Sequence, residues 1–285
     1  MEGDFQLLYS LCVKTNNEHI LNYLLKKWKL NHFLVSIKQF KIYKNITVHY
    51  SGNSPDSFYQ IIADDITDMI VEYYEANLVK TILNTNYFYF SDSEKIKIYK
   101  ETISELKKDM IARKANIFLS IFQYLKENRI LILDGFVHFR LKEYLTLLDH
   151  VVDVCVDHFL VEREYDEFVN LLKIYIHSKE SKINKIHLFY EKQEAFLFDE
   201  LNTPIDIDMN SLNAKYLSDI SFSKNDYVLN TLLTLIPKKL LIHSLEEKDD
   251  FIHTLELIFD DRIQFCNSCS LCKKWKMEKK KEILK

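Results

Sequence analysis

Hydrophobic residues recur every three to four positions through much of the chain, which is the spacing of an amphipathic helix. The first such pattern follows Thr15-Asn16-Asn17-Glu18, a capping-box sequence, and its apolar face consists of Ile20, Leu21, Leu24, Leu25 and Trp28. A long helical region is predicted over about 56–128. We expect breaks near Asn84–Asn86 and at Ser91-Asp92-Ser93, where Ser91 and Glu94 can form a second capping box.

The middle of the chain has the clearest helical pattern. Asp134 is predicted to cap a helix whose apolar residues are Phe136, Phe139, Leu141, Tyr144, Leu145 and Leu148. A second stripe consists of Val161, Tyr165, Phe168, Val169, Leu172, Tyr175 and Ile176. Between them, 152–157 alternates apolar and polar residues as a strand would. We predict helix there too, because helical patterns flank it without turn residues.

Two regions have the composition of β-strands. Residues 33–50 are rich in Val, Ile and aromatic residues and predict one or two strands ending at the turn 51–55. Nearer the C-terminus we predict strands at 185–190, 195–199, 239–243 and 262–265, with helices at 224–236 and 249–259. Strand, helix, strand is the unit that forms parallel pairs. The expected fold is therefore α+β and predominantly helical, with a helical middle and a small C-terminal α/β layer.

This pattern divides the chain into four parts. We expect an N-terminal α+β and helical region at 1–128 and central helices at 129–180. A small α/β region at 181–272 ends in a cysteine cluster, and a basic tail follows at 273–285. The composition, 47% hydrophobic and 28% charged, is that of a globular protein.

The scarcity of glycine excludes several classes of enzyme. The chain has only three glycines, Gly3, Gly52 and Gly135, and they are far apart. Dinucleotide-binding and P-loop sites need clustered glycines so that backbone N–H groups can approach phosphates. The G-x-S-x-G turn of many hydrolases is absent for the same reason.

Charge and the lack of targeting signals suggest a cytoplasmic protein. Glu2 and Asp4 stand where a secretory signal would carry basic residues, and no transmembrane segment is expected, because polar residues interrupt even the most apolar stretch, 227–242. The net charge is −4, but the seven Lys and two Glu of 273–285 give that tail +5. The tail can contact nucleic acid or an acidic protein partner, or it can be a solvated terminus.

Three of the five cysteines form the strongest local motif. Cys266, Cys269 and Cys272 are separated by two residues each, a spacing that lets thiolates turn towards one zinc ion or an iron–sulfur cluster. His243 or His253 can supply a fourth ligand, and Cys12 is a more distant alternative. The fourth cysteine and the proline of a bacterial ferredoxin motif are missing. A reduced, solvent-facing loop is the alternative interpretation.

Other polar clusters have simpler explanations. Asp149, Asp153 and Asp157 share one helix face that attracts cations, but a solvated face explains them. The acidic run 162–167 can supply an acid and a base, or it can complement a helix dipole. His138, His187 and His243 alternate with apolar neighbours, as packing histidines do. A hydrolase or nuclease that uses carboxylates is therefore our third hypothesis.

Three segments carry a resemblance to a known family: Asp134-Gly135-Phe136-Val137-His138-Phe139-Arg140-Leu141-Lys142-Glu143-Tyr144, Phe159-Leu160-Val161-Glu162-Arg163-Glu164-Tyr165-Asp166-Glu167-Phe168 and Ile236-Pro237-Lys238-Lys239-Leu240-Leu241-Ile242-His243. They resemble the YtxC-like sporulation proteins of endospore-forming Firmicutes. The resemblance covers roughly 129–272 well and the first hundred residues weakly. It implies a role in sporulation but transfers no site residue.

Three functions follow, in order of preference. The first is a non-enzymatic interaction or scaffold protein associated with sporulation, which would bind a protein partner. The second is a metal-binding protein that holds zinc or an iron–sulfur cluster with Cys266, Cys269 and Cys272. The hydrolase or nuclease is the third.

Overall fold

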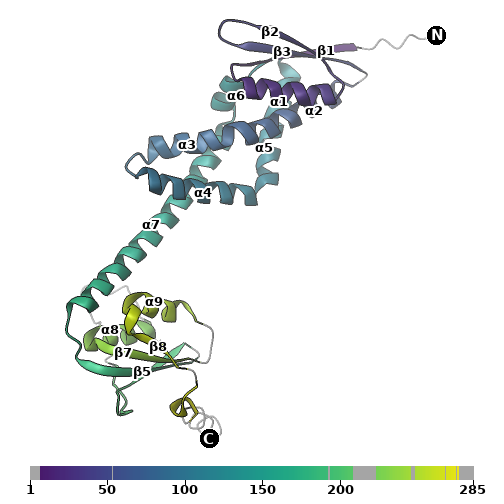
Figure 1. Ribbon diagram of the computed structural model, residues 1–285. Coiled ribbons are helices and arrows are strands. Elements are labelled where there is room, and N and C mark those ends of the chain that lie inside the picture. The colour runs from purple at the N-terminus through teal and green to yellow at the C-terminus, as the bar shows by residue number, and fades with distance from the viewer. Residues whose placement is uncertain are drawn as a thin grey trace. The chain divides into compact units, whose positions relative to one another are not determined.

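The computed structural model describes residues 7–52, 54–191, 193–207, 223–244, 248–266, 268–273 and 275. The chain divides into two compact units, Met1–Val161 and Glu162–Lys285 (Figure 1). Each unit has its own hydrophobic core. The predicted α+β, mostly helical fold is confirmed. The division falls inside the long helix α7 (Lys142–Ser178), and each unit is described by itself below.

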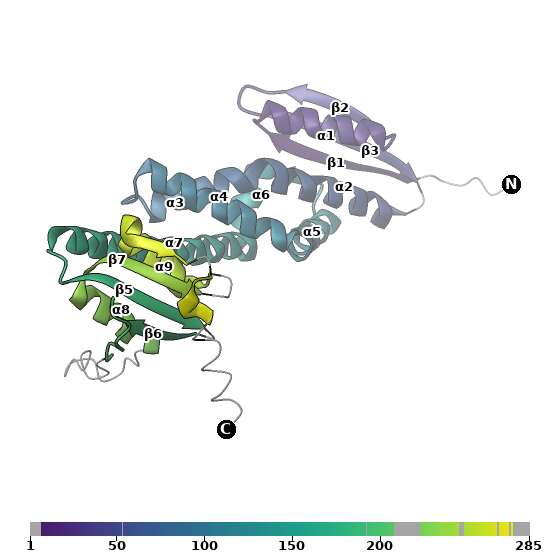
Figure 2. The same ribbon diagram turned by 60° about the horizontal axis from the view of Figure 1, so that its bottom comes forward.

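The first unit begins with a four-stranded sheet. Its strands are β1 (Leu7–Thr15), β2 (Leu34–Gln39), β3 (Lys44–Gly52) and β4 (Ile130–Ile132), in the order β2-β3-β1-β4. The pairs β1–β3 and β2–β3 are antiparallel, and β1–β4 is parallel. Residues 33–50 contain two strands, β2 and β3, within the predicted one or two. Helix α1 (Glu18–Leu30) packs on the sheet (Figure 2). Strands β1 and β4 were not predicted from the sequence.

The start of α1 differs from the predicted capping box. The N-cap residue is Asn17, whose Oδ1 accepts the backbone N–H groups of His19 and Ile20. The Thr15 hydroxyl instead accepts the N–H of Asn17, and Thr15 itself ends β1. The strand explains the difference, because its pairing with β3 keeps Thr15 extended and the helix can begin only two residues later.

The helices of the first unit follow the predicted breaks. They are α2 (Pro55–Met69), a π-helical turn (Ile70–Tyr74), α3 (Glu75–Asn86), α4 (Asp92–Lys108), α5 (Met110–Glu127), α6 (Leu133–Arg140) and the first part of α7. The capping box of Ser91 and Glu94 is confirmed at the start of α4. A further break at Asp109 was not predicted.

Asp134 does not cap a helix as predicted. It lies in the first turn of α6, and its carboxylate accepts a hydrogen bond of 2.6 Å from the Tyr74 hydroxyl. The hydroxyl of a distant helix therefore uses the oxygen that a cap would have used. The segment 152–157 is helical, as predicted from its flanks.

The second unit has a four-stranded sheet in the order β6-β5-β7-β8. Its elements are β5 (Ile183–Glu191), β6 (Glu194–Phe198), α8 (Lys224–Leu235), β7 (Pro237–Ser244), α9 (Asp250–Phe259), a 3-10 turn (Asp260–Arg262) and β8 (Ile263–Phe265). The pair β5–β6 is an antiparallel hairpin, and β5–β7 and β7–β8 are parallel. The predicted α/β layer is confirmed.

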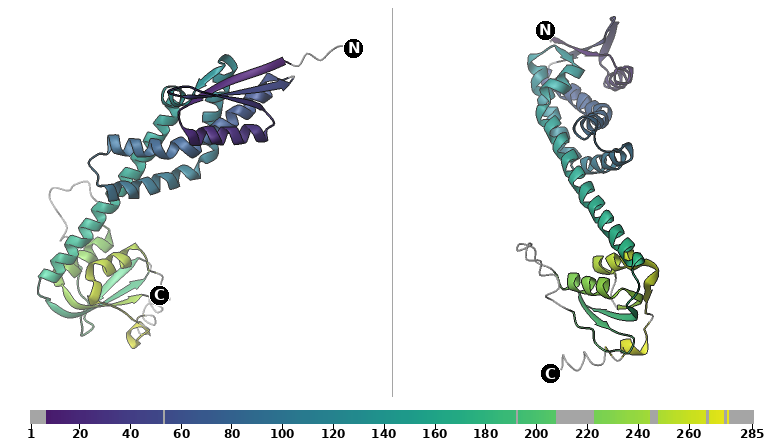
Figure 3. Two further views of the ribbon diagram at one scale, coloured as in Figure 1. Left: turned by 45° about the horizontal axis from the view of Figure 1, so that its top comes forward. Right: turned by 90° about the vertical axis from the view of Figure 1, so that its left-hand side faces the viewer.

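All three helices of this unit pack on one face of its sheet. The core combines side chains of α7, α8 and α9 with alternate residues of β5 and β7, namely Ile186, Leu188, Tyr190, Leu240 and Ile242. Helices α8 and α9 lie on one side of the sheet, and the turn at 270–273 lies on the other (Figures 1 and 3). The opposite face of the sheet is therefore available to the segment that follows β8.

No helix among the described residues is long and apolar enough to cross a membrane.

Candidate metal centre

Two buried histidines lie on the sheet face that the helices leave uncovered. His187 of β5 and His243 of β7 occupy the strand positions between the core residues, so strand alternation turns them away from the helices. Only 5% of His187 and 4% of His243 is exposed. Phe189 pairs directly with His243 in the parallel register, and their rings stack with centroids 4.3 Å apart.

Strand pairing brings the cysteine segment to these histidines. Phe265 pairs with Ile242, and the N–H of Cys266 then donates to the Ile242 carbonyl oxygen over 2.9 Å. Cys266 is thus held beside His243. Ser268 has a φ of 70°, a left-handed conformation that reverses the chain. A short helical turn then carries Cys272 back towards Cys266.

Four potential ligand atoms converge here. Nδ1 of His243 lies 3.2 Å from Sγ of Cys272 and 3.7 Å from Sγ of Cys269. Sγ of Cys272 is 3.6 Å from that of Cys266 and 3.7 Å from that of Cys269. All four atoms lie within 4.8 Å of one another. Three sulfurs and one nitrogen around a tetrahedral zinc ion would be separated by about 3.5–3.8 Å.

The backbone supports the same arrangement. The N–H of Cys269 donates to Sγ of Cys266 over 3.3 Å, which ties the two ends of the turn together. Cys272 and His243 are buried, and Cys266 and Cys269 are half-buried. The Trp275 ring packs on Phe189, Phe196 and Phe198. The segment therefore covers its own part of the open sheet face.

The surroundings of Cys272 disfavour its thiolate, whereas those of Cys269 favour its thiolate. Burial raises the pKa of Cys272 to about 12, and its contacts with the thiols of Cys266 and Cys269 act in the same direction. Burial also opposes ionisation of Cys269, but hydrogen bonds from the Cys272 backbone and from the neighbouring thiols outweigh it and lower the pKa of Cys269. A bound metal ion would remove this competition, because ligand thiols bind as thiolates.

His243 is suited to bind as a neutral ligand. Burial, together with the neighbouring His187 and Lys185, lowers the pKa of His243 to about 4. Burial and then Lys185 also lower the pKa of His187. Both imidazoles are therefore neutral at pH 7, and each has one nitrogen with a free lone pair.

Of the two histidines expected to supply a fourth ligand, the structure brings His243 to the cysteines. His253 lies exposed on α9, where its Nδ1 is 4.0 Å from the Glu256 carboxylate. Cys12 lies in β1 of the first unit. The alternation of His187 with apolar neighbours predicts only a packing role for it. The sequence could indicate its place beside His243 in one way: each of two strands carries a histidine on the same face of the sheet. That signal can be used only once the two strands are known to pair.

The other candidate residues have partners or solvent around them. Asp149 accepts a hydrogen bond of 3.0 Å from the Asn86 amide, and Asp153 accepts one from the Tyr87 hydroxyl. Asp157 is exposed. Within 162–167 most side chains are exposed, and Arg163 forms an ion pair with Glu167. The basic tail lies mostly outside the described residues, which include only Lys273 and Trp275 of it.

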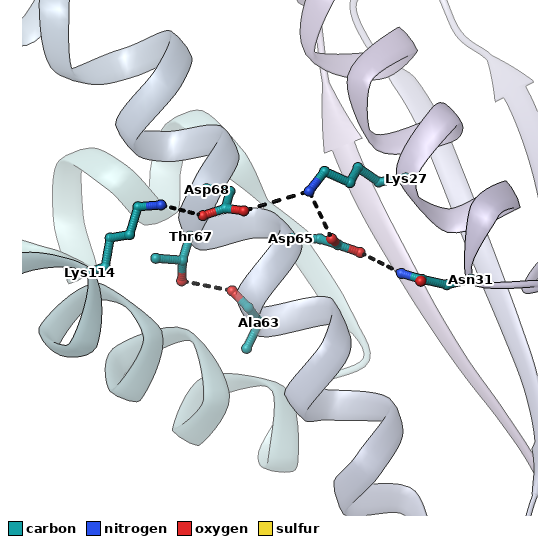
Figure 4. A network of polar contacts seen from close by, with 7 residues as sticks. All are labelled: Lys27, Asn31, Ala63, Asp65, Thr67, Asp68 and Lys114. Atoms are coloured by element: carbon teal, nitrogen blue, oxygen red, sulfur yellow. Dashed lines mark hydrogen bonds and ion pairs between the residues drawn. The ribbon is translucent and has the colours of Figure 1, made fainter. Parts of the chain in front are cut away.

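A second polar cluster lies between α1, α2 and α5 of the first unit (Figure 4). The Lys27 ammonium lies 3.8 Å from a carboxylate oxygen of Asp65 and 3.6 Å from one of Asp68. Lys114 lies 2.6 Å from Asp68, and the Asn31 amide donates to Asp65 over 3.2 Å. Burial is the largest cause that raises the pKa of Asp65, to about 6. These carboxylates are neutralised by lysines of the chain, so the cluster joins helices.

The chain belongs to the YtxC-like family, whose model matches residues 60–264. The match begins earlier than the resemblance suggested and ends two residues before Cys266. It therefore includes His187 and His243 but none of the three clustered cysteines.

One curated relative is a Bacillus subtilis (strain 168) protein that bears the name "Uncharacterized protein YtxC". It is 21% identical over 155 residues, which are 54% of this chain and 54% of the relative. The matched part thus spans about half the length of that relative. No solved structure matches the chain.

Proposed function

We propose that the second unit binds one zinc ion through Nδ1 of His243 and the sulfurs of Cys266, Cys269 and Cys272. The observation that carries the proposal is the convergence of these four atoms from two separate segments. Sγ of Cys272 lies 3.2–3.7 Å from each of the other three atoms, and Sγ of Cys269 lies 3.7 Å from Nδ1 of His243. Three of these distances, 3.6, 3.7 and 3.7 Å, lie within the range of about 3.5–3.8 Å for the edges of a tetrahedral zinc site, and the fourth is 3.2 Å. Three thiolates and an imidazole are also a donor set that zinc prefers.

The spacing favours a single ion over an iron–sulfur cluster. In a cluster the cysteines bind different iron atoms, so their sulfurs must lie farther apart than ligands of one ion. Here all four donor atoms lie within 4.8 Å of one another. Four protein ligands leave no position for water or substrate, which is the arrangement of a structural zinc site.

The centre would attach the segment after β8 to the sheet. Strand β8 has only three residues, and the helices cover the other face. Helices α7, α8 and α9 do not pack on this face of the sheet. A metal ion bound to His243 and to the three cysteines would cross-link the segment after β8 to strand β7 there.

Metal analysis of protein purified without chelator tests the proposal. We expect about one zinc ion per chain, and a tetrahedral sulfur–nitrogen absorption spectrum when cobalt replaces zinc. The variant Cys269→Ser should lose at least 90% of the bound metal. Cys12→Ser is the matched control, because Cys12 is a cysteine of β1 outside the cluster. Folded wild-type protein that takes up no metal after incubation with zinc would overturn the proposal.

We also infer, as a second candidate, a non-enzymatic sporulation protein that binds a protein partner. The membership in the YtxC-like family supports it, and so do the exposed apolar side chains of α7 in the second unit, Phe168, Leu171 and Ile174. Deleting the gene in an endospore-forming host should lower the count of heat-resistant spores. An unchanged count would remove this candidate.

A further inference from the structure

The proposed metal ligand His243 forms a hydrogen bond through its second ring nitrogen. Its Nε2 lies 2.9 Å from Nδ1 of His187. The two rings are nearly parallel, with an interplanar angle of 17° and centroids 5.2 Å apart. Two ring nitrogens at this distance form a hydrogen bond only if one of them donates its N–H and the other accepts with its lone pair.

The position of the cysteines decides which nitrogen donates. Nδ1 of His243 faces Sγ of Cys272 at 3.2 Å and Sγ of Cys269 at 3.7 Å. A metal ion bound between them requires a lone pair on that Nδ1, so the ring proton must be on Nε2. Nε2 then donates to His187, and His187 carries its own proton on Nε2.

We propose that His187 is the positioning residue of the centre: its Nδ1 accepts the Nε2–H of His243 and holds His243 in the tautomer that offers Nδ1 to the metal. This inference rests on the proposed zinc site. Histidines that bind metals almost always donate their other N–H to an acceptor, which fixes both the tautomer and the orientation of the ring. His187 takes the place that a carboxylate or a backbone carbonyl has in other sites.

Two aromatic neighbours, Phe189 and His187, restrain different motions of the His243 ring. Phe189 stacks on the ring at an interplanar angle of 7° and so restrains its plane. A ring held only by stacking can still turn within that plane or change tautomer. The hydrogen bond to His187 removes this freedom, because it fixes one nitrogen at 2.9 Å from a partner on the neighbouring strand.

The parallel pairing of β5 and β7 fixes the distance between the two histidines. Phe189 pairs with His243 and His187 pairs with Leu241, so the two histidines are diagonal neighbours on one face. The buried position of His187, 5% exposed, keeps water from replacing it as the acceptor. Strand pairing and burial therefore both hold the acceptor nitrogen of His187 beside His243.

Two variants of His187 separate a positioning role from packing. His187→Phe keeps a ring of similar size but removes the acceptor, and His187→Asn keeps an acceptor oxygen near the place of Nδ1. We expect His187→Phe to weaken zinc binding about 10–100-fold in competition with a chelator. His187→Asn should bind closer to the wild type than to His187→Phe. His253→Phe is the matched control, because His253 is exposed on α9 of the same unit.

The tautomer of His243 is a readout that a packing role would not change. Nitrogen-15 NMR of the full-length protein should show the proton on Nε2 of His243 both without metal and with zinc. In His187→Phe the metal-free protein should show a mixture of tautomers. A proton on Nδ1 in the metal-free wild type, or equal zinc affinity in all variants, would overturn the inference. Wild-type protein that binds no zinc would instead overturn the proposed function, whatever the tautomer.

Discussion

The two units of the chain bury polar side chains in different ways. In the first unit the Arg113 guanidinium lies 2.8 Å from a carboxylate oxygen of Glu75, and the Tyr144 hydroxyl donates to the same oxygen over 2.8 Å. All three side chains are buried, and each has its partner within the chain. The first unit therefore satisfies its buried charge by itself.

The second unit gathers groups that all offer lone pairs. Three sulfurs and one imidazole nitrogen face one another within 4.8 Å. Neutral thiols can share weak hydrogen bonds, but their full donor capacity is used only when a cation lies among them. A buried polar cluster therefore indicates a ligand when its members cannot satisfy one another's hydrogen-bonding groups.

Removal of the metal should destabilise the second unit strongly and leave the first unit unchanged. Removing zinc with a chelator should sharply increase hydrogen exchange in β7 and β8, because the free energy of binding a structural zinc ion contributes directly to folding, on the order of 10 kcal/mol. Exchange in β1 and β3 should not change. Equal changes in both sheets would contradict the comparison, and hydrogen exchange resolved by peptide mass spectrometry measures it.

The buried ion pair of the first unit should give the next largest effect. Arg113→Met leaves the Glu75 carboxylate buried without its partner, so the free energy of unfolding should fall by about 3–5 kcal/mol. The double variant Glu75→Gln with Arg113→Met should lose less than the sum of the two single variants. Urea unfolding measures these values, and simple additivity would show that the pair is not coupled.

The raised pKa of Asp65 should make the stability of the first unit depend on pH. Its pKa rises from 3.8 in the unfolded chain to about 6 in the folded protein, so the folded state binds the proton more tightly. The contribution of Asp65 therefore favours folding below pH 4 and is lost as the pH rises to 6. Asp65→Asn should be more stable than the wild type at pH 8 by about 1–3 kcal/mol, and the difference should shrink at pH 4. A difference that is independent of pH would contradict the raised pKa.

The smallest effect concerns the helix cap that the sequence predicted. Ser91→Ala removes the side chain that accepts the Glu94 N–H at the start of α4. The free energy of unfolding should fall by about 1 kcal/mol. Ser104→Ala on the exposed surface of the same helix is the control and should change it by less than about 0.5 kcal/mol. Equal effects of the two variants would contradict the capping role.

Local patterns in the sequence predicted most of the fold. The helical spacing of 161–176 and the strand, helix, strand order of the second unit needed only neighbouring residues. Strands β1 and β4 could not be predicted, because their pairing joins positions that are far apart in the sequence, such as Cys12 and Ile130. The Thr15 cap was wrong for the same reason, since the pairing of Thr15 with Lys44 keeps it in a strand.

The site was only partly readable from the sequence. The spacing of Cys266, Cys269 and Cys272 indicates a group of ligands because it acts within seven residues. The choice between His243 and His253 depends on which strand lies beside β8, and the sequence does not contain that information locally. The role of His187 depends in addition on the register between β5 and β7.

The three-residue pairing of β8 gives the proposed centre a consequence for how the sheet assembles. Side chains alternate along a strand, so a slip of β8 by one residue along β7 would turn Cys266 towards the helices and out of reach of His243. Such a short strand carries few hydrogen bonds with which to reject the wrong alignment. Metal binding would therefore select the correct register between β7 and β8, because only that register allows all four ligands to meet.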